Sequence, residues 1–176
     1  NGNTEGDVDF TINYFDLAGN AGSQVISTTN SSVVTYDETV PTLTNVTIAS
    51  SNADPTLSTI NDVITLTINA AENIQLPTIT IGSGNGVLFS GSNGETVYEY
   101  TYTMQASDGT ADAIPFTIDF LDMANNPGIQ VTSTANDADG GVAFDKDSPT
   151  ISIITITSDN ANRNGSGSGA GLAVVG

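Results

Sequence analysis

The chain has 176 residues, and twenty acidic against two basic side chains give it a formal charge of -18 at pH 7. Such acidity excludes nucleic acids and anionic membrane surfaces as partners, because both would repel the chain. The chain contains no His, Cys or Trp, which excludes the usual zinc sites and nucleophile pairs of the Ser/His or Cys/His kind. The abundant reactive groups that remain are carboxylates, which suit hard cations such as Ca²⁺.

No run of about eighteen apolar residues is present that could span a bilayer as a helix, and no charged-then-apolar stretch opens the chain. We therefore expect no membrane insertion in this segment. Apolar residues make up 38% of the chain, and β-branched side chains are abundant, which favours a globular β protein over a disordered one.

An internal repeat organises the chain. Residues 10–30 (FTINYFDLAGNAGSQVISTTN) align with residues 116–136 (FTIDFLDMANNPGIQVTSTAN) at an offset of 106, with twelve identities in 21 positions. After a slip of two residues the alignment continues at an offset of 108, which pairs Tyr36, Asp37 and Pro41 with Phe144, Asp145 and Pro149. A repeat of about 108 residues is long enough to be a domain in its own right.

The repeat divides the chain into three parts. Residues 1–37 are predicted to be the last two strands, F and G, of one unit. Residues 38–148 are predicted to be a complete unit with its incoming and outgoing linkers. Residues 149–176 are predicted to be the first strand and the A–B loop of a further unit, with the Gly165–Gly169 stretch (GSGSG) as an expansion of that loop. The simplest explanation is that the chain is a window on a longer tandem array.

Within the complete unit, apolar and polar residues alternate with a period of two, which predicts short strands separated by polar turns. In chain order the predicted strands are A around Val46 and Ile48, B over 63–70, C over 78–81, E over 97–104, F over 116–121, and G over 129–134 with an extension to Phe144. Turns are predicted at residues 82–86 and 92–94. No stretch has a convincing helical period. About seven strands in such a unit predict an all-β fold of immunoglobulin-like antiparallel β-sandwich repeats in tandem.

Three sequence segments resemble those of a known family. They are FTINYFDLAGNAG, VVTYDETVPTL and LTINAAENI, the last of which lies between the two copies of the repeat. The chain resembles the bacterial immunoglobulin-like (BIg-type) domains that are strung in tandem through giant surface adhesins and other large extracellular proteins. The second copy departs from the first by placing Asn125 where Gly19 stands, which a turn tolerates because Asn also visits left-handed conformations. The resemblance implies an extender that holds a ligand-binding end away from the cell and often binds calcium at domain junctions.

A calcium site is predicted at the entrance to the complete unit. In the predicted strand order, the B–C and F–G connections lie at the same end of the sandwich as the incoming linker. That end gathers five oxygen-bearing side chains: Asp37, Glu38, Glu72, Asp122 and Asn126. Because Ca²⁺ takes six to eight oxygens, backbone carbonyls and water would complete the shell. The equivalent groups for the flanking units are Asp16 and Asn20 on one side and Asp145 and Asp147 on the other.

These residues also have simpler interpretations. Asp16 and Asp122 begin Asp-x-Ala-x-Asn segments, which form good turns without an ion. Asp37 and Asp145 each stand four residues before a Pro and could cap a strand. High acidity could also reflect a salty habitat in which repulsion is screened.

We therefore expect a non-enzymatic spacer segment of a large bacterial surface or secreted protein, located outside the cell, with Ca²⁺-stiffened junctions. Its partners are expected to be neighbouring units of the same chain or filament, with an unknown cell-surface ligand elsewhere in the protein. The alternative is a subunit of an extracellular filament or surface layer that assembles by β-strand complementation.

Overall fold

The alternating segments form strands, as a computed structural model shows for residues 4–134 and 141–156. All regular structure in these residues is β, and they contain no helix long and apolar enough to cross a membrane. The described strands are β1 (Gly6–Asp7), β2 (Thr35–Tyr36), β3 (Leu43–Ser50), β4 (Leu57–Ser58), β5 (Val63–Ile74), β6 (Thr78–Ile81), β7 (Gly84–Asn85), β8 (Val87–Ser90), β9 (Glu95–Thr103), β10 (Phe116–Asp119) and β11 (Ala143–Phe144).

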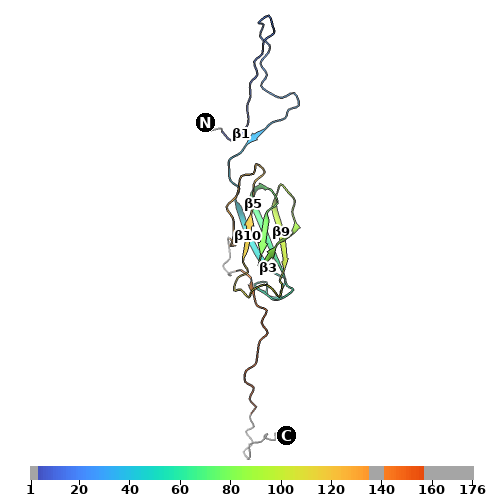
Figure 1. Cartoon of the computed structure of the whole chain (residues 1–176), viewed down its shortest axis with the longest axis vertical. Coiled ribbons are helices and arrows are strands. Elements are labelled where there is room, and N and C mark those ends of the chain that lie inside the picture. The colour runs from blue at the N-terminus through green and yellow to red at the C-terminus, as the bar shows by residue number, and fades with distance from the viewer. Residues whose placement is uncertain (1–3, 135–140, 157–176) are drawn as a thin grey trace, which may run out of the picture. The chain divides into compact units, whose positions relative to one another are not determined.

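Most of these strands belong to two antiparallel sheets. The first has the order β3-β5-β9-β8 and the second has the order β10-β6-β7. The segment after β10 extends the second sheet through a bridge between Ile118 and Val131. Figure 1 shows β3, β5, β9 and β10 gathered in one body. The short strands β4 and β11 pair in parallel.

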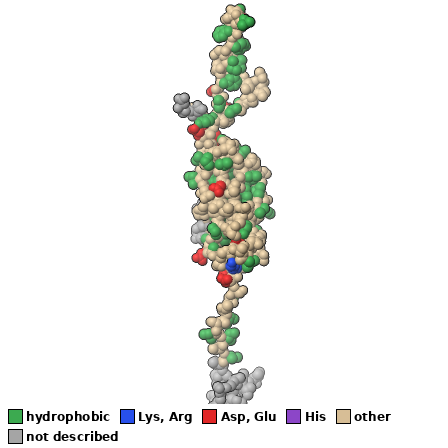
Figure 2. All heavy atoms as spheres, in the orientation of Figure 1, with side chains coloured by type: hydrophobic (Ala, Val, Ile, Leu, Met, Phe, Trp, Pro, Cys, Tyr) green, Lys and Arg blue, Asp and Glu red, His purple; other side chains and the backbone are tan. Residues whose placement is uncertain are grey.

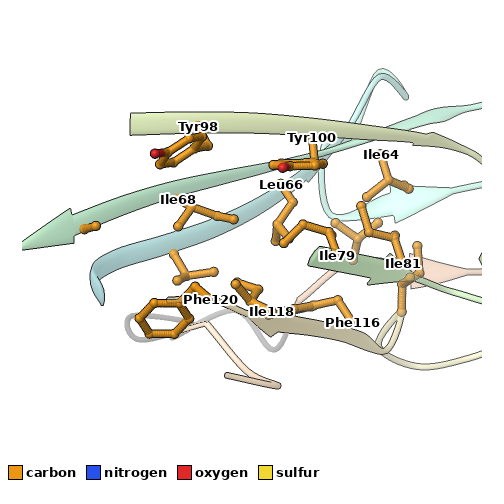
Figure 3. Close-up of a cluster of buried hydrophobic side chains, with 14 of the residues drawn as sticks. Ile64, Leu66, Ile68, Ile79, Ile81, Tyr98, Tyr100, Phe116, Ile118 and Phe120 are labelled. Carbon is orange, nitrogen blue, oxygen red and sulfur yellow. The ribbon is translucent and has the colours of Figure 1, made fainter. Parts of the chain in front are cut away.

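One hydrophobic core fills the space between the two sheets, which makes the fold a β-sandwich. The first sheet contributes alternate residues of β5 and β9, and the second contributes those of β6 and β10 (Figure 3). The central members are Ile64, Leu66, Ile68, Tyr98, Tyr100, Ile79, Ile81, Phe116, Ile118 and Phe120. Burial of this apolar surface is the main favourable term in the stability of the fold.

The all-β prediction is confirmed, and most strand positions agree with it. The predicted strand C has the observed bounds of β6. The predicted strand B corresponds to β5, which continues for four residues beyond the predicted end at Ala70. Four short strands were not predicted: β1, β4, β7 and β8. Of these, β8 lies at an edge with all four residues exposed, and β7 closes a tight hairpin within the predicted turn 82–86. Exposed and very short strands carry little hydrophobic alternation, which explains why the pattern missed them. The predicted strand G over 129–134 forms only an isolated bridge at Val131.

The N-terminal segment at residues 10–26 forms the same hairpin as the aligned residues 116–132. The Asp16 amide donates to the Asn20 carbonyl at 3.0 Å, and the aligned Asp122 amide donates to the Asn126 carbonyl at 3.1 Å. Gly19 has a φ of 87°, and Asn125 in its place has a φ of 75°. The prediction that Asn replaces Gly at a left-handed position is therefore confirmed.

The two copies of the hairpin differ in burial. Phe10, Ile12 and Tyr14 are 38%, 51% and 51% exposed, and Figure 2 shows hydrophobic side chains at the surface of the segment that precedes the sandwich. The aligned Phe116, Ile118 and Phe120 are 6%, 0% and 5% exposed. The same hairpin therefore forms whether or not its apolar face is covered.

The chain divides into two units, Asn1–Lys146 and Asp147–Gly176. The described part of the second unit, residues 147–156, contains no strand, and Ile151, Ile153, Ile154 and Ile156 are exposed. The predicted first strand of a further unit falls partly in this segment and stays a prediction. The predicted loop at Gly165–Gly169 lies outside the described residues.

Candidate metal centre

Three carboxylates from separate segments meet at the end of the sandwich where the linker enters. Ligand oxygens of Asp37, Glu72 and Asp122 all lie within 4.8 Å of one another. Asp122 is 1% exposed, and the other two are partly buried. The predicted convergence of the linker, the B–C region and the F–G turn is confirmed for these three residues.

The strand pairing at this end brings Glu72 and Asp122 together. Ile74, the last residue of β5, forms a bridge with Asp122, and the Gln75 amide donates to the Leu121 carbonyl at 2.9 Å. The pairing of β5 with β9 shifts register between Asn69 and Ile74. Glu72 therefore lies in an irregular part of β5, and not in the B–C turn where it was predicted.

Asp122 organises its own turn. Its Oδ1 accepts the amides of Ala124 and Asn126, both at 2.8 Å, and its Oδ2 accepts the Asn126 side-chain Nδ2 at 2.8 Å. The predicted turn-forming role is therefore present. A carboxylate has about four lone-pair sites, so three hydrogen bonds leave room for one further ligand. Forming the turn and binding a cation are compatible in this residue.

Asp37 reaches the site from the linker that precedes β3. Asn126 Nδ2 donates to the Asp37 carbonyl oxygen at 3.0 Å, which ties the segment before β3 to the turn that follows β10. The Asp37 side chain accepts the Thr39 amide at 2.9 Å. Asn126 was predicted as a ligand, but its amide nitrogen faces both acidic residues. Its role in this structure is to hold Asp37 and Asp122 in place.

The electrostatics of the site are unfavourable without a cation. Burial raises the pKa of Glu72, and the charges of Asp122, Asp37 and Glu5 raise it further. Among the described residues the only basic side chain is Lys146, which donates to the carbonyls of Ala106 and Asp108 instead. Like charges about 4 Å apart repel by about 4 kcal/mol at an effective dielectric of 20.

Asp122 stays ionised for a different reason. Its burial raises its pKa, but the hydrogen bonds from Asn126, Ala124 and Asn125 outweigh burial and bring the pKa below its ordinary value. The site thus holds one carboxylate that hydrogen bonds keep charged beside another whose charge is disfavoured.

The spacing fits a hard divalent cation. Oxygens that bind one Ca²⁺ lie about 2.3–2.6 Å from it, so two of them are at most about 5 Å apart. The three carboxylates therefore need little movement to share one ion. Their donor set is all oxygen, which is the chemistry that hard cations prefer.

The remaining predicted ligands lie outside this trio. The Glu38 side chain accepts the Tyr36 hydroxyl, and the Glu38 amide donates to Glu5 at 3.0 Å. Asp16 accepts the amides of Ala18 and Asn20 and the Asn20 side chain, all at 2.9 Å, in a turn that matches the turn of Asp122. The structure thus uses Asp16 and Asn20 to form a turn.

The last two predicted ligands follow β11. The Asp145 amide donates to the Ser58 carbonyl at 3.0 Å, and Asp147 begins the second unit. Neither belongs to the trio, and their assignment to a flanking junction stays a prediction.

Two residues near the site were missed by the sequence analysis. Gln75 Nε2 donates to the Asp122 carbonyl at 2.8 Å and to Asn125 Oδ1 at 2.9 Å, which braces the turn. Glu5 adds negative charge next to Glu72. The repeat gave no signal for Glu5, because the aligned residue at an offset of 106 is Ala111.

Comparisons of the chain with protein-family models, with curated protein sequences and with solved structures find no match.

Proposed function

We propose that this chain is a spacer segment of a large bacterial surface or secreted protein, built from tandem immunoglobulin-like units whose junctions are stiffened by Ca²⁺. The observation that carries the proposal is the trio of Asp37, Glu72 and Asp122, because one of its members belongs to the linker and two belong to the sandwich. An ion bound by all three would fix the linker relative to the unit that it enters. This role is mechanical and needs no catalytic group.

The strand order supports the immunoglobulin-like assignment. The order β3-β5-β9-β8 corresponds to strands A, B, E and D of a constant-type immunoglobulin sandwich. The second sheet, with β6, β10 and the segment around Val131, corresponds to strands C, F and G. The tandem arrangement is supported by the matching hairpins at residues 10–26 and 116–132, which keep the same bridges at Ile12–Val25 and Ile118–Val131.

Calcium is proposed over other hard cations because Ca²⁺ accepts irregular coordination and six to eight oxygens, whereas Mg²⁺ requires a near-ideal octahedron at about 2.0–2.1 Å. A site assembled from a linker, an irregular part of β5 and the turn of Asp122 suits the more adaptable ion. In an extracellular setting, such sites typically bind Ca²⁺ with a Kd of about 10⁻⁴–10⁻³ M.

Small-angle X-ray scattering of the full chain tests the proposal. We expect the maximum dimension and the flexibility of the chain to change when 5 mM Ca²⁺, about five times the upper limit of such a Kd, replaces a chelator. The Glu72→Gln variant should lose this response, and Glu99→Gln, which removes the same charge from a β9 residue that pairs with Thr67, should keep it. Identical profiles with and without Ca²⁺ would contradict the stiffening claim.

The alternative function, assembly into a filament or surface layer, has one observation in its favour. Phe10, Ile12 and Tyr14 expose an apolar face that is buried in the aligned residues of the complete unit, so this face needs covering by further strands. Those strands can come from the same chain or from another copy. Sedimentation of the full chain distinguishes the two, because strand exchange between copies predicts dimers or longer assemblies that grow with concentration.

A further inference from the structure

The chain leaves the sandwich through a lysine that bonds back onto the body of the same unit. Lys146 Nζ donates to the carbonyl oxygens of Ala106 at 3.0 Å and Asp108 at 2.7 Å. Both carbonyls belong to the loop between β9 and β10, whereas Lys146 stands two residues after the end of β11. The side chain thus joins the outgoing segment to a loop about 40 residues earlier in the chain.

The loop that receives Lys146 is held in one shape by the buried carboxylate of Asp108, which is 2% exposed. Its Oδ1 accepts the Ser83 amide at 3.2 Å and the Ser83 hydroxyl, and its Oδ2 accepts the Gln105 amide at 2.7 Å. The Tyr102 hydroxyl lies 3.2 Å from both oxygens. The two carbonyls that face Lys146 are therefore presented from a fixed position.

The first copy of the repeat makes an equivalent connection with different chemistry. Glu38 aligns with Lys146 at the offset of 108 residues. Here Glu5 Oε1 accepts the Glu38 amide at 3.0 Å and the Thr39 hydroxyl at 2.7 Å. Glu5 aligns with Ala111, which lies in the segment that precedes β10. In both copies the residues that follow strand G are thus bonded back to the segment that precedes strand F.

We propose that these contacts form an exit latch, in which Lys146 in one copy and Glu5 in the other fix the direction in which the chain leaves its unit. The latch needs no ion, because Lys146 donates to neutral carbonyls and Glu5 accepts from a neutral amide and a neutral hydroxyl. It deepens the spacer function proposed above: the trio holds the linker to the unit that follows, and the latch holds it to the unit that precedes. A joint held on both sides bends less than one held on a single side.

Amide hydrogen exchange of the full chain in a chelator tests the latch. In Lys146→Met, which keeps the aliphatic stem, we expect the protection factor at Asp145 to fall about three- to tenfold, as the loss of a hydrogen bond to a backbone acceptor implies. The backbone NMR order parameters of Asp147 and Ser148 should fall as well. The Tyr98 amide in the core strand β9 is the internal control and should keep its protection.

The first copy offers a matched pair of variants. Glu5→Ala should lower the protection factor at Glu38 by a similar factor, whereas Glu5→Gln keeps an oxygen acceptor and should retain most of the protection. Unchanged protection at Asp145 and Glu38 in Lys146→Met and Glu5→Ala overturns the latch, and so does an equal loss at Tyr98. The chelator separates this outcome from a failure of the spacer function, which would show as scattering that does not respond to Ca²⁺.

Discussion

At the scale of single residues, Glu72 and Asp122 lie side by side in environments that act oppositely on their charge. Asp122 receives three hydrogen bonds to its oxygens, which lower its pKa in spite of burial. Glu72 is shifted upward by burial and by the neighbouring carboxylates. A divalent cation would favour the ionised form of Glu72 most, because it would replace the repulsion from neighbouring carboxylates by attraction.

Replacing Glu72 tests this balance. A group whose pKa is raised on folding binds protons more tightly in the folded state, so its contribution to stability falls as pH rises from its ordinary pKa through the raised value. In a chelator we therefore expect the melting temperature of Glu72→Gln to match the wild type at low pH and to exceed it at neutral pH. With Ca²⁺ the wild type should have the higher melting temperature at neutral pH. Differential scanning calorimetry from pH 4 to 8 measures both, with Glu99→Gln as the control; a variant less stable than the wild type at pH 7 in chelator contradicts the account.

Variants of Asp122 separate its turn-forming role from its role as a ligand. Asp122→Ala removes the carboxylate that accepts the partly buried hydrogen bonds from the amides of Ala124 and Asn126, which should destabilise the fold by about 1–3 kcal/mol even in a chelator. Asp122→Asn keeps one carbonyl acceptor and should lose less stability, yet it should lose most of the stabilisation by Ca²⁺. Urea unfolding with and without Ca²⁺ measures both effects. A full Ca²⁺ response in Asp122→Asn would remove this residue from the ligand set.

At the scale of elements, the hairpin after β10 is determined by local contacts that recur in the N-terminal copy. A Cβ placed on Gly128 would lie 2.2 Å from the Phe120 ring, and a Cβ on Gly22 would lie 2.2 Å from the Tyr14 ring. In each copy the glycine amide also donates to the carbonyl of that aromatic residue, at 3.0 Å and 2.9 Å respectively. The aromatic ring thus lies flat over the glycine on the neighbouring strand, and only a residue without a side chain fits beneath it.

A substitution of this glycine should therefore be costly where the ring cannot move. Phe120 is 5% exposed and belongs to the core, so Gly128→Ala should destabilise the sandwich by about 1–3 kcal/mol through overpacking. Gly109→Ala is the matched control, because no atom lies within 4 Å of its added Cβ. Thermal unfolding of the two variants checks the difference. Equal melting temperatures would show that the ring adjusts freely.

At the scale of the whole molecule, the formal charge of -18 acts in two ways that differ in their dependence on salt. Repulsion among dispersed surface carboxylates is screened by any salt, with a Debye length of about 10 Å at 0.1 M. Repulsion within the trio is partly shielded from solvent by burial and is relieved best by an ion that binds there. The acidity of the chain can therefore reflect both general solvation and a specific site.

Comparing Ca²⁺ with NaCl at equal ionic strength distinguishes these two contributions. For the wild type we expect a few millimolar CaCl₂ to raise the melting temperature more than NaCl of the same ionic strength, because binding to the folded state adds stability as the ligand concentration exceeds Kd. For Asp37→Asn the two salts should act alike. Equal effects of both salts on the wild type would favour screening in a salty habitat over a specific site.

The sequence by itself determined the β class, the repeat and the core. Alternation with a period of two placed Ile64, Leu66 and Ile68 on one face, and all three are fully buried, because burial of apolar surface decides which face of a strand turns inward. The repeat also predicted the left-handed Asn125, since a turn that requires positive φ accepts Gly or Asn. These features depend on local chemistry and on hydrophobic pattern.

The strand order expected from the sequence gathers five candidate ligands at one end of the sandwich, and only the tertiary structure decided which of them meet. Asp37, Glu38 and Asp122 looked alike in sequence, but Asp37 and Asp122 join the trio while Glu38 turns to Tyr36 and Glu5. The edge strand β8, the bracing role of Gln75 and the contacts of Lys146 were likewise not predicted. The strand β8 has no buried face to give an alternating pattern. The contacts of Gln75 and Lys146 join segments far apart in the chain, which the pattern of neighbouring residues does not specify.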